Sequence, residues 1–246
     1  MQKIVVLGAT SAIAQATQRL CARHGKEMLL VARAPERLSV VRSDLLARGA
    51  KAVEILPADF NEISRHKEIL RFVEERLPGF DTVLLAFGSL LDPEQSARSV
   101  ELSLQEWNTN FVCAAALLTL FANHFEQRRS GCVAAITSVA GDRGRRSNYV
   151  YGAAKGALSI FLQGLRSRLH PAGVRVITIK PGPVDTPMTA HMRKGVAFVK
   201  PEVIARDIYR ALEDGSRDVL YTPSYWRYIM AAIRILPERI FKRLAI

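Results

Sequence analysis

The sequence predicts a single α/β domain: a doubly wound, mostly parallel sheet of about seven strands with helices on both faces. Apolar runs of strand length alternate along the chain with amphipathic stretches of helical length, which is typical of successive β-α-β units. The apolar runs are almost continuous in Val, Ile and Leu, as expected for parallel strands that are buried on both faces.

Each expected element follows from this alternation. Strands are expected at residues 4–7, 28–31, 52–56, 82–86, 133–137, 174–179 and 219–221. Helices are expected at residues 13–24, 35–48, 63–76, 104–125, 149–170 and 202–213. No linker, repeat or low-complexity tract divides the chain, so we expect one domain over residues 1–223, with a substrate lid near 184–200 and a basic tail over 224–246.

Composition limits the function classes. The 246 residues are 49% hydrophobic and 24% charged, which indicates a folded globular protein. No signal peptide is apparent, and Cys21, Cys113 and Cys132 are too few and too scattered for a disulfide framework or a metal site, so we expect a cytoplasmic protein without a metal. The net charge of +12 leaves nucleic acid, an anionic membrane surface and a phosphorylated substrate open as partners.

The first expected strand runs into a turn of small residues directly before a helix. Small side chains there let the backbone approach a pyrophosphate, and the helix N-terminus offers it N–H groups. The candidate cofactor residues in this turn are Gly8, Thr10, Ser11, Ala12 and Ile13. Only Gly8 is a glycine, because Ala12 and Ala14 stand where a stronger fingerprint would have two more.

The end of the second expected strand bears on the choice between NADP and NAD. An acidic residue there would bind a ribose 2′-hydroxyl, but Arg33 follows the strand instead. Because an arginine can bind a 2′-phosphate through charge-assisted hydrogen bonds, we expect NADP(H) to be preferred, with NAD(H) still open. An arginine that only caps the sheet edge is the alternative. Asp59, after the third strand, is a candidate for the adenine edge or an ordinary loop aspartate.

Tyr151 and Lys155 are four positions apart, and Ser138 precedes Tyr151 by thirteen positions. On a helix, residues i and i+4 share a face, so the Lys155 ammonium would lie beside the Tyr151 phenol. The cation would lower the pKa of the phenol towards neutrality, where general acid–base catalysis is efficient, and Ser138 would hydrogen-bond the same substrate oxygen. A Tyr-x-x-x-Lys pattern alone is also common on solvated helix faces, so its meaning depends on the surrounding motifs.

Together these residues resemble the short-chain dehydrogenase/reductase superfamily, with its Rossmann fold, over essentially the whole chain. Asn110 resembles the catalytic asparagine, which organises a proton-relay water in that family, and Ser138, Tyr151 and Lys155 match the catalytic serine, tyrosine and lysine in type, order and spacing. Residues 181–186 match the segment that contacts the nicotinamide carboxamide. The resemblance therefore implies cofactor contacts at Tyr151, Lys155, Pro181, Gly182, Val184 and Thr186.

Two departures from the family pattern are visible. Ala12 and Ala14 add methyl groups near the pyrophosphate, which implies a displaced or less tightly bound cofactor. The family's Asn-Asn-Ala-Gly after the fourth strand is Leu85-Ala86-Phe87-Gly88 here, so its buried asparagine bonds must be replaced. Gly88 carries over as a position of close approach, with Phe87 beside it as a cofactor contact.

The second half of the chain resembles one branch more narrowly, the decaprenylphosphoryl-2-keto-erythro-pentose reductases. The similarity is strongest from Gly131 to the C-terminus and includes the arginine-rich loop before Tyr151, Thr189-Ala190-His191 and the segment from Trp226. It implies a keto-sugar on a polyprenyl phosphate as the substrate, and a flavin-dependent oxidase as a partner.

Arg143, Arg145 and Arg146 lie between Ser138 and Tyr151, on the rim of the expected active site. Such a cluster suits a phosphodiester on the substrate, for which Met188 is a further contact candidate. The alternative is a solvated loop in a basic protein. Nucleic-acid binding is the weakest use of the charge, because the chain has no recognition module and no basic stripe with interleaved aromatic residues.

The tail combines aromatic and aliphatic residues with five cationic side chains, Arg227, Arg234, Arg239, Lys242 and Arg243. No apolar stretch reaches the roughly 18–20 residues needed to span a bilayer. The pattern favours a helix, broken at Pro237, that lies in an anionic membrane surface. Packing on the domain, or on a second subunit of a homo-oligomer, is the alternative.

These observations favour an NADPH-dependent ketoreductase at the cytoplasmic membrane face, with Tyr151 as the general acid and a lipid-linked keto-sugar as substrate. The first alternative is the same chemistry on another carbonyl, such as an acyl, steroid or small-molecule ketone. The second is a non-catalytic NADP(H)-binding protein, which only Ala12 and Ala14 support and the Ser138, Tyr151 and Lys155 set contradicts.

Overall fold

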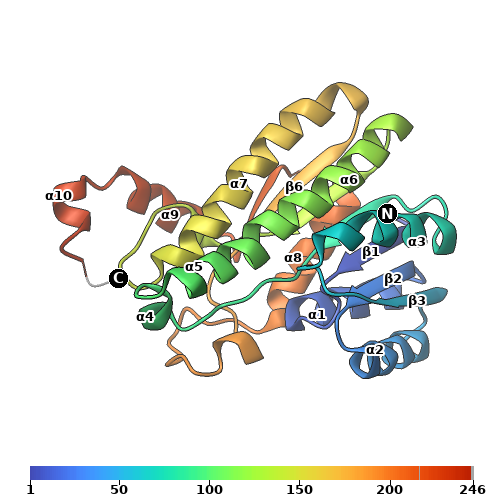
Figure 1. Cartoon of the computed structure of the whole chain (residues 1–246), viewed down its shortest axis with the longest axis horizontal. Coiled ribbons are helices and arrows are strands. Elements are labelled where there is room, and N and C mark those ends of the chain that lie inside the picture. Colours follow the sequence, from blue (N-terminus) through green and yellow to red (C-terminus); the bar gives the residue numbers. More distant parts are fainter. Residues whose placement is uncertain (216, 245–246) are drawn as a thin grey trace.

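The computed structural model describes residues 1–215 and 217–244. Its centre is a seven-stranded sheet in the order β3-β2-β1-β4-β5-β6-β7, and all neighbouring strands are parallel. The strands are β1 (Lys3–Leu7), β2 (Glu27–Ala32), β3 (Ala52–Pro57), β4 (Thr82–Leu85), β5 (Cys132–Ile136), β6 (Arg175–Pro181) and β7 (Val219–Thr222). The predicted doubly wound α/β fold is confirmed, and the sheet is wholly rather than mostly parallel (Figure 1).

The helices alternate with the strands as expected up to α8, and α9 and α10 form the C-terminal segment after the last strand. The helices are α1 (Ala12–Arg23), α2 (Pro35–Ala47), α3 (His66–Arg76), α4 (Pro93–Ser96), α5 (Val100–Trp107), α6 (Cys113–Arg128), α7 (Tyr149–Leu169), α8 (Pro201–Asp214), α9 (Trp226–Ile235) and α10 (Glu238–Phe241). The short helix α4 was not expected; Asp92 caps it by accepting a hydrogen bond from the Gln95 backbone N–H at 2.9 Å. Among the described residues, no helix is long and apolar enough to cross a membrane.

Successive strand residues face opposite layers, which explains why the strands are apolar throughout. Val5 and Leu7 pack into the core beneath α3, α6 and α7. Ile4 and Val6 point the other way, into the core beneath α1, α2 and α8. Because both faces are covered, a polar residue on either side of β1 would be buried without solvent.

The strand order reverses direction at the centre of the sheet. β1 pairs with β2 on one side and with β4 on the other. The chain therefore leaves the ends of the neighbouring strands β1 and β4 in different directions. In such sheets a crevice opens at this point, at the carboxyl ends of the strands. The loops after β5 and β6 leave the sheet at the same edge.

The predicted helix over residues 104–125 is longer and less regular than expected. It begins at Val100 in α5, passes through one π-helical turn, η2 (Asn108–Val112), and continues as α6. Such π turns widen a helix locally and occur often at functional sites. Asn110 lies in this turn and is buried.

The C-terminal segment packs on the domain through Arg143, in the loop before α7. The Arg143 guanidinium donates hydrogen bonds to the backbone carbonyls of Ile233 and Leu236, the latter at 2.7 Å, and forms an ion pair with Glu238 at 3.0 Å. Its Cζ also lies 3.8 Å from the centre of the Phe241 ring. The helical break expected at Pro237 is observed between α9 and α10 (Figure 1), and residues 245–246 of the tail lie outside the described residues.

Candidate active site

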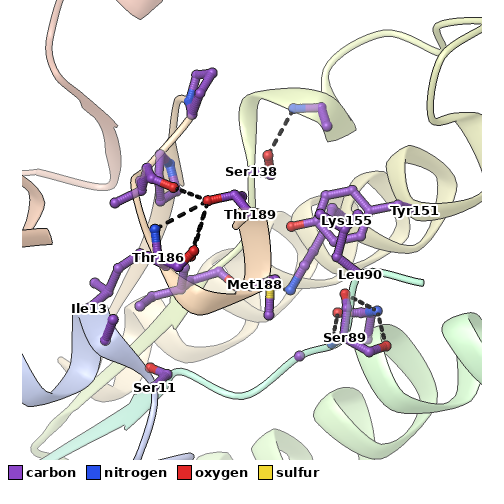
Figure 2. Close-up of a pocket in the computed structure, with 18 of the residues that line it drawn as sticks. Ser11, Ile13, Ser89, Leu90, Ser138, Tyr151, Lys155, Thr186, Met188 and Thr189 are labelled. Carbon is purple, nitrogen blue, oxygen red and sulfur yellow. Dashed lines mark hydrogen bonds between the residues drawn. The ribbon is translucent and has the colours of Figure 1, made fainter. Parts of the chain in front are cut away.

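A cavity of about 410 Å³ lies at the carboxyl ends of the central strands. Its wall comes from the turn after β1, the loops after β4, β5 and β6, the start of α7 and the start of α9. The expected site residues that line it are Thr10, Ser11, Ala12, Ile13, Phe87, Gly88, Asn110, Ser138, Arg145, Tyr151, Lys155, Pro181, Gly182, Val184, Thr186 and Met188. Residues far apart in sequence therefore meet in one concave space (Figure 2).

The turn after β1 presents a helix N-terminus to this cavity. Ser11 caps α1 by accepting a hydrogen bond from the Ala14 backbone N–H at 3.2 Å. Ala12 lines the cavity, whereas Ala14 is fully buried in the core between α1 and the sheet. Only one of the two alanine methyl groups that depart from the family pattern therefore faces the space where a pyrophosphate would bind. Gly8 lies beneath the turn, against the backbone of Phe87.

Ser138, Tyr151 and Lys155 come together through β5 and α7. Ser138 follows β5 in extended backbone, and its hydroxyl accepts a hydrogen bond from the Ala140 N–H at 3.1 Å. Tyr151 and Lys155 share one face of α7, with the Lys155 Nζ 5.7 Å from the centre of the Tyr151 ring. Figure 2 shows both side chains reaching into the same space, with Ser138 on the neighbouring loop.

Burial governs the protonation of this pair. Desolvation raises the pKa of the Tyr151 phenol, although the neighbouring Ser138 hydroxyl acts in the opposite direction. Desolvation lowers the pKa of Lys155 to about 8. The expected fall of the tyrosine pKa towards neutrality is not found, because removal of the phenol from water outweighs the Ser138 hydrogen bond and the negative charge of Glu106 adds to the rise. At neutral pH Tyr151 therefore holds its proton.

Asn110 is fixed by a buried carboxylate that sequence analysis missed. Its Nδ2 donates to Glu106 Oε1 at 2.9 Å and to Ser89 Oγ at 3.0 Å, while its Oδ1 accepts from the Ser89 backbone N–H at 3.2 Å. The second Glu106 oxygen accepts from Ser89 Oγ at 3.2 Å and from the Leu91 N–H at 3.1 Å. Ser89 and Glu106 thus supply polar contacts around the loop where the family pattern has asparagines. A Glu four residues before the Asn, on one helical face, was the only sequence signal.

Gly88 allows this network to approach Lys155. A Cβ atom at Gly88 would lie 2.6 Å from the Asn110 Oδ1 and 3.2 Å from the Lys155 Nζ. Any larger residue would force these two side chains away from the loop. Lys155 is also held by a hydrogen bond from its Nζ to the Ile136 carbonyl at 3.4 Å.

The segment after β6 forms a second polar wall. The Thr189 hydroxyl donates to the Val184 carbonyl at 2.6 Å and accepts from the Thr186 N–H at 3.1 Å, which fixes the short 3-10 helix Pro187–Thr189 over the cavity (Figure 2). Thr189 was not among the expected contacts. The rest of the expected lid runs as irregular chain from 190 to 200, and Val184 forms a β-bridge with Val199.

A second buried network supports the loop that carries Ser138. Asp142 forms an ion pair with Lys180, immediately before Pro181, and accepts a hydrogen bond from the Tyr221 hydroxyl at 2.6 Å. Burial and the Asp142 carboxylate raise the pKa of Tyr221 to about 12, so this donor keeps its proton. The network ties the loops after β5 and β6 together.

Several expected residues lie outside the cavity. Arg33 is exposed, Arg146 is exposed in the loop before α7, and Arg143 is directed to the C-terminal segment. Asp59 accepts a hydrogen bond from the Asn61 N–H at 3.0 Å and does not line the cavity. Arg37, on α2, does line it and donates to the Thr10 carbonyl at 3.4 Å, a role that sequence analysis did not anticipate. Among the described residues, no group of three or more His, Cys, Asp or Glu side chains could hold a metal ion.

Comparison with known proteins identifies the family. Residues 2–197 match the short chain dehydrogenase family. An uncharacterised oxidoreductase of Mycobacterium tuberculosis strain H37Rv is 34% identical over 242 residues, which cover 98% of this chain and 96% of that protein.

Two solved structures share the fold. A short chain dehydrogenase from Burkholderia cenocepacia in complex with NADP has a TM-score of 0.84 at 19% identity, with all of both chains covered. An actinorhodin polyketide ketoreductase with NADPH has a TM-score of 0.80 at 21% identity, with 89% of this chain and 95% of that chain covered. These names do not bear out the narrower resemblance to lipid-linked keto-sugar reductases. The prediction of an oxidoreductase is confirmed, and the chain belongs to the short-chain dehydrogenase family.

Proposed function

We propose that this protein is an NADPH-dependent ketoreductase. The observation that carries the proposal is the meeting of Ser138, Tyr151 and Lys155 in one cavity, with Asn110 fixed beside them. A phenol that keeps its proton at neutral pH is a general acid, which is the form that carbonyl reduction requires.

The residues around the turn after β1 fit a dinucleotide phosphate. The N-terminus of α1 faces the cavity at Ser11 and Ala12, and backbone N–H groups at such a terminus bind phosphate oxygens. The Arg37 guanidinium beside Thr10, with Arg33 nearby in sequence, supplies positive charge for a 2′-phosphate. These features, together with the NADP and NADPH of the two solved structures named above, support NADP(H) over NAD(H).

Each catalytic side chain has a separate role in the proposed reaction. Bound NADPH supplies a hydride to the carbonyl carbon. Ser138 donates a hydrogen bond to the carbonyl oxygen, and Tyr151 transfers its phenolic proton to that oxygen as negative charge develops there. Lys155 presents a cation beside Tyr151 and, in this proposal, would also hold the nicotinamide ribose. Asn110 orients the proton-relay water from which Tyr151 regains its proton.

Glu106 acts through Lys155 and Asn110. Desolvation disfavours the Lys155 ammonium, whereas the negative charge of Glu106 favours it and raises its pKa. Glu106 also holds Asn110 Nδ2 at 2.9 Å. It is therefore a positioning residue that keeps Lys155 protonated near neutral pH.

A narrower form of the proposal concerns the substrate and its location. In this form the ketone is a keto-sugar on a polyprenyl phosphate, produced by a flavin-dependent oxidase and met at an anionic membrane surface by a homo-oligomer. Its support is the C-terminal segment, where Tyr228, Ile229, Ile235 and Ile240 are exposed among arginines. Trp226, at the start of that segment, lines the cavity, so a membrane-bound tail would lie next to the substrate.

Replacement of Tyr151 by phenylalanine tests the proposed chemistry. We expect Tyr151→Phe to lower kcat for NADPH-dependent ketone reduction by about 100-fold or more, because the general acid is removed. The dissociation constant for NADPH should change little, since the ring remains. NADPH oxidation and fluorescence titration measure the two quantities, and a variant that retains wild-type turnover would refute the proposal.

The cofactor preference depends on the two arginines near the turn. The double substitution Arg33→Ala and Arg37→Ala is expected to raise KM for NADPH by about 10-fold or more, because a charge-assisted bond contributes about 1.5–3 kcal/mol. KM for NADH should stay within about 2-fold. Arg42→Ala, on the exposed face of α2, is the control. An equal rise in KM for NADPH and NADH would mean that these arginines do not bind the 2′-phosphate.

Glu106→Gln tests the support of Lys155. Loss of the carboxylate lowers the pKa of Lys155 further, so the alkaline fall in kcat/KM, expected near pH 8 in the wild type, should move to lower pH. Glu106→Asp keeps the charge and should restore the profile in part, while Glu101→Gln, exposed on the same helix, should leave it unchanged. An alkaline limb that stays in place in a folded Glu106→Gln protein would contradict this role.

The membrane part of the narrower proposal is tested by sedimentation with vesicles of anionic phospholipid. We expect the wild type to bind and the double variant Tyr228→Ser, Ile235→Ser to lose most of that binding, because exposed apolar side chains enter the lipid interface. Val40→Ser, an exposed position on α2, is the matched control. Absence of wild-type binding would remove this part of the proposal and leave the ketoreductase intact.

A further inference from the structure

One wall of the active-site cavity carries polar atoms that lack partners. Among the described residues, the buried side-chain atoms without a hydrogen bond include Arg145 Nε, Asn148 Oδ1 and Trp226 Nε1, and all three residues line this cavity. A buried polar atom without a partner costs about 1–3 kcal/mol. Three such residues on one wall mark it as a polar side of the cavity, where the protein itself does not use all of its hydrogen-bonding groups.

Among the described residues, no carboxylate forms an ion pair with Arg145. The acidic residues of the surrounding loops are engaged elsewhere: Asp142 pairs with Lys180, Asp185 with Lys194, and Glu238 with Arg143. Burial lowers the pKa of the Arg145 guanidinium, but an arginine remains charged at any physiological pH. The described residues that line the cavity include Arg37, Arg145 and Lys155 and no Asp or Glu. The cavity therefore favours an anion.

The place of Arg145 in the fold separates it from the proposed cofactor contacts. Arg37 lies on α2, beside the turn after β1, where it donates to Thr10. Arg145 lies in the loop between Ser138 and α7, six residues before Tyr151. Lys155 lies deeper, beside Tyr151 and the Ile136 carbonyl. The three cations therefore lie in different parts of the cavity, and Arg145 belongs to the loop that joins Ser138 to the helix carrying Tyr151.

Asn148 and Trp226 flank this loop with two further polar groups. Asn148 is the N-cap residue of α7 but makes no side-chain capping bond, and its Oδ1 has no partner. Trp226 is 9% exposed and packs with Val139, the residue after Ser138. Its indole Nε1 lies against Gly182, where a Cβ atom would come within 1.9 Å of it. The indole N–H can donate a hydrogen bond to an anionic oxygen, whereas the Asn148 Oδ1 accepts one and suits a hydroxyl or N–H group of the ligand.

We propose that Arg145 and Trp226 form a subsite for an anionic group, a carboxylate or a phosphate, on the carbonyl substrate, with Asn148 beside it as a hydrogen-bond acceptor. This inference rests on the proposed ketoreductase function and specifies its substrate class. Leu90, Met192 and Phe198 also line the cavity, so the body of the substrate has apolar surface beside its charged group. A planar guanidinium binds carboxylate and phosphate oxygens in pairs, which makes Arg145 the main determinant of this selectivity.

Matched pairs of ketones test the subsite by NADPH oxidation. One pair is 4-oxocyclohexanecarboxylate and its neutral methyl ester, and the other is dihydroxyacetone phosphate and dihydroxyacetone. We expect the wild type to prefer the anionic member of at least one pair, which also distinguishes a carboxylate from a phosphate. Arg145→Gln should lower kcat/KM for that anion by about 10- to 100-fold and for its neutral partner by less than about 3-fold.

Controls separate this role from structural and cofactor effects. Arg145→Lys keeps the charge and should retain part of the preference, whereas Arg146→Gln, the exposed neighbour outside the cavity, should behave as the wild type. KM for NADPH should not change in Arg145→Gln. Equal losses on both members of a pair, or a weaker interaction with NADPH, would overturn the inference while leaving the ketoreductase proposal in place.

Calorimetric titration of the NADPH complex tests the subsite without turnover. Benzoate and phenyl phosphate are the anionic probes, and benzyl alcohol is the neutral one. We expect at least one anion to bind the wild type about 10-fold more tightly than benzyl alcohol does, and Arg145→Gln to abolish the difference. No preference for either anion would overturn the inference. An anion preference that depends on Arg145, in a protein that reduces none of the ketones, would support the subsite and count against the ketoreductase proposal.

Discussion

Burial of the Lys155 ammonium is the constraint on which the active site depends. An ammonium that is removed from water loses hydration free energy, and its pKa falls, here to about 8. Glu106 opposes this fall with a second buried charge. A buried carboxylate needs hydrogen-bond donors of its own, and Asn110, Ser89 and the Leu91 backbone supply them. The catalytic asparagine of the family pattern is therefore also one of the groups that make the charge of Glu106 tolerable.

The local backbone is shaped around this arrangement. Glu106 and Asn110 are four residues apart where α5 passes into the π-helical turn, so the amide can reach the carboxylate one turn back. Gly88 leaves room for Asn110 and Lys155 to approach the loop after β4. The network thus joins three elements, α5, α7 and the loop after β4, at the carboxyl edge of the sheet. A displacement of any one of them would also displace Lys155.

Much of this could be predicted from the sequence, for a physical reason. The positions of strands and helices along the chain follow from local hydrophobic periodicity, and Ser138, after β5, keeps a fixed spacing to Tyr151 and Lys155 on α7. The partners of those residues could not be predicted, because they are set by tertiary packing. Glu106 resembles any helical glutamate in sequence, and Arg37 resembles any surface arginine on α2. The three arginines before Tyr151 look equivalent in sequence, yet they point to the tail, the cavity and the solvent.

The net charge of +12 is partly explained by cations that line the cavity. A basic protein can spread its cations over a solvated surface, where each interacts weakly with its surroundings. Here Lys155 is buried, and Arg145 and Arg37 also line the cavity, at positions suited to a catalytic cation, a substrate anion and a cofactor phosphate. A site with three cations and no acidic residue in its described wall would repel a cationic substrate and concentrate an anionic one. If Tyr151 is the general acid, as we propose, the charge attached to a carbonyl would then affect how readily it reaches this residue.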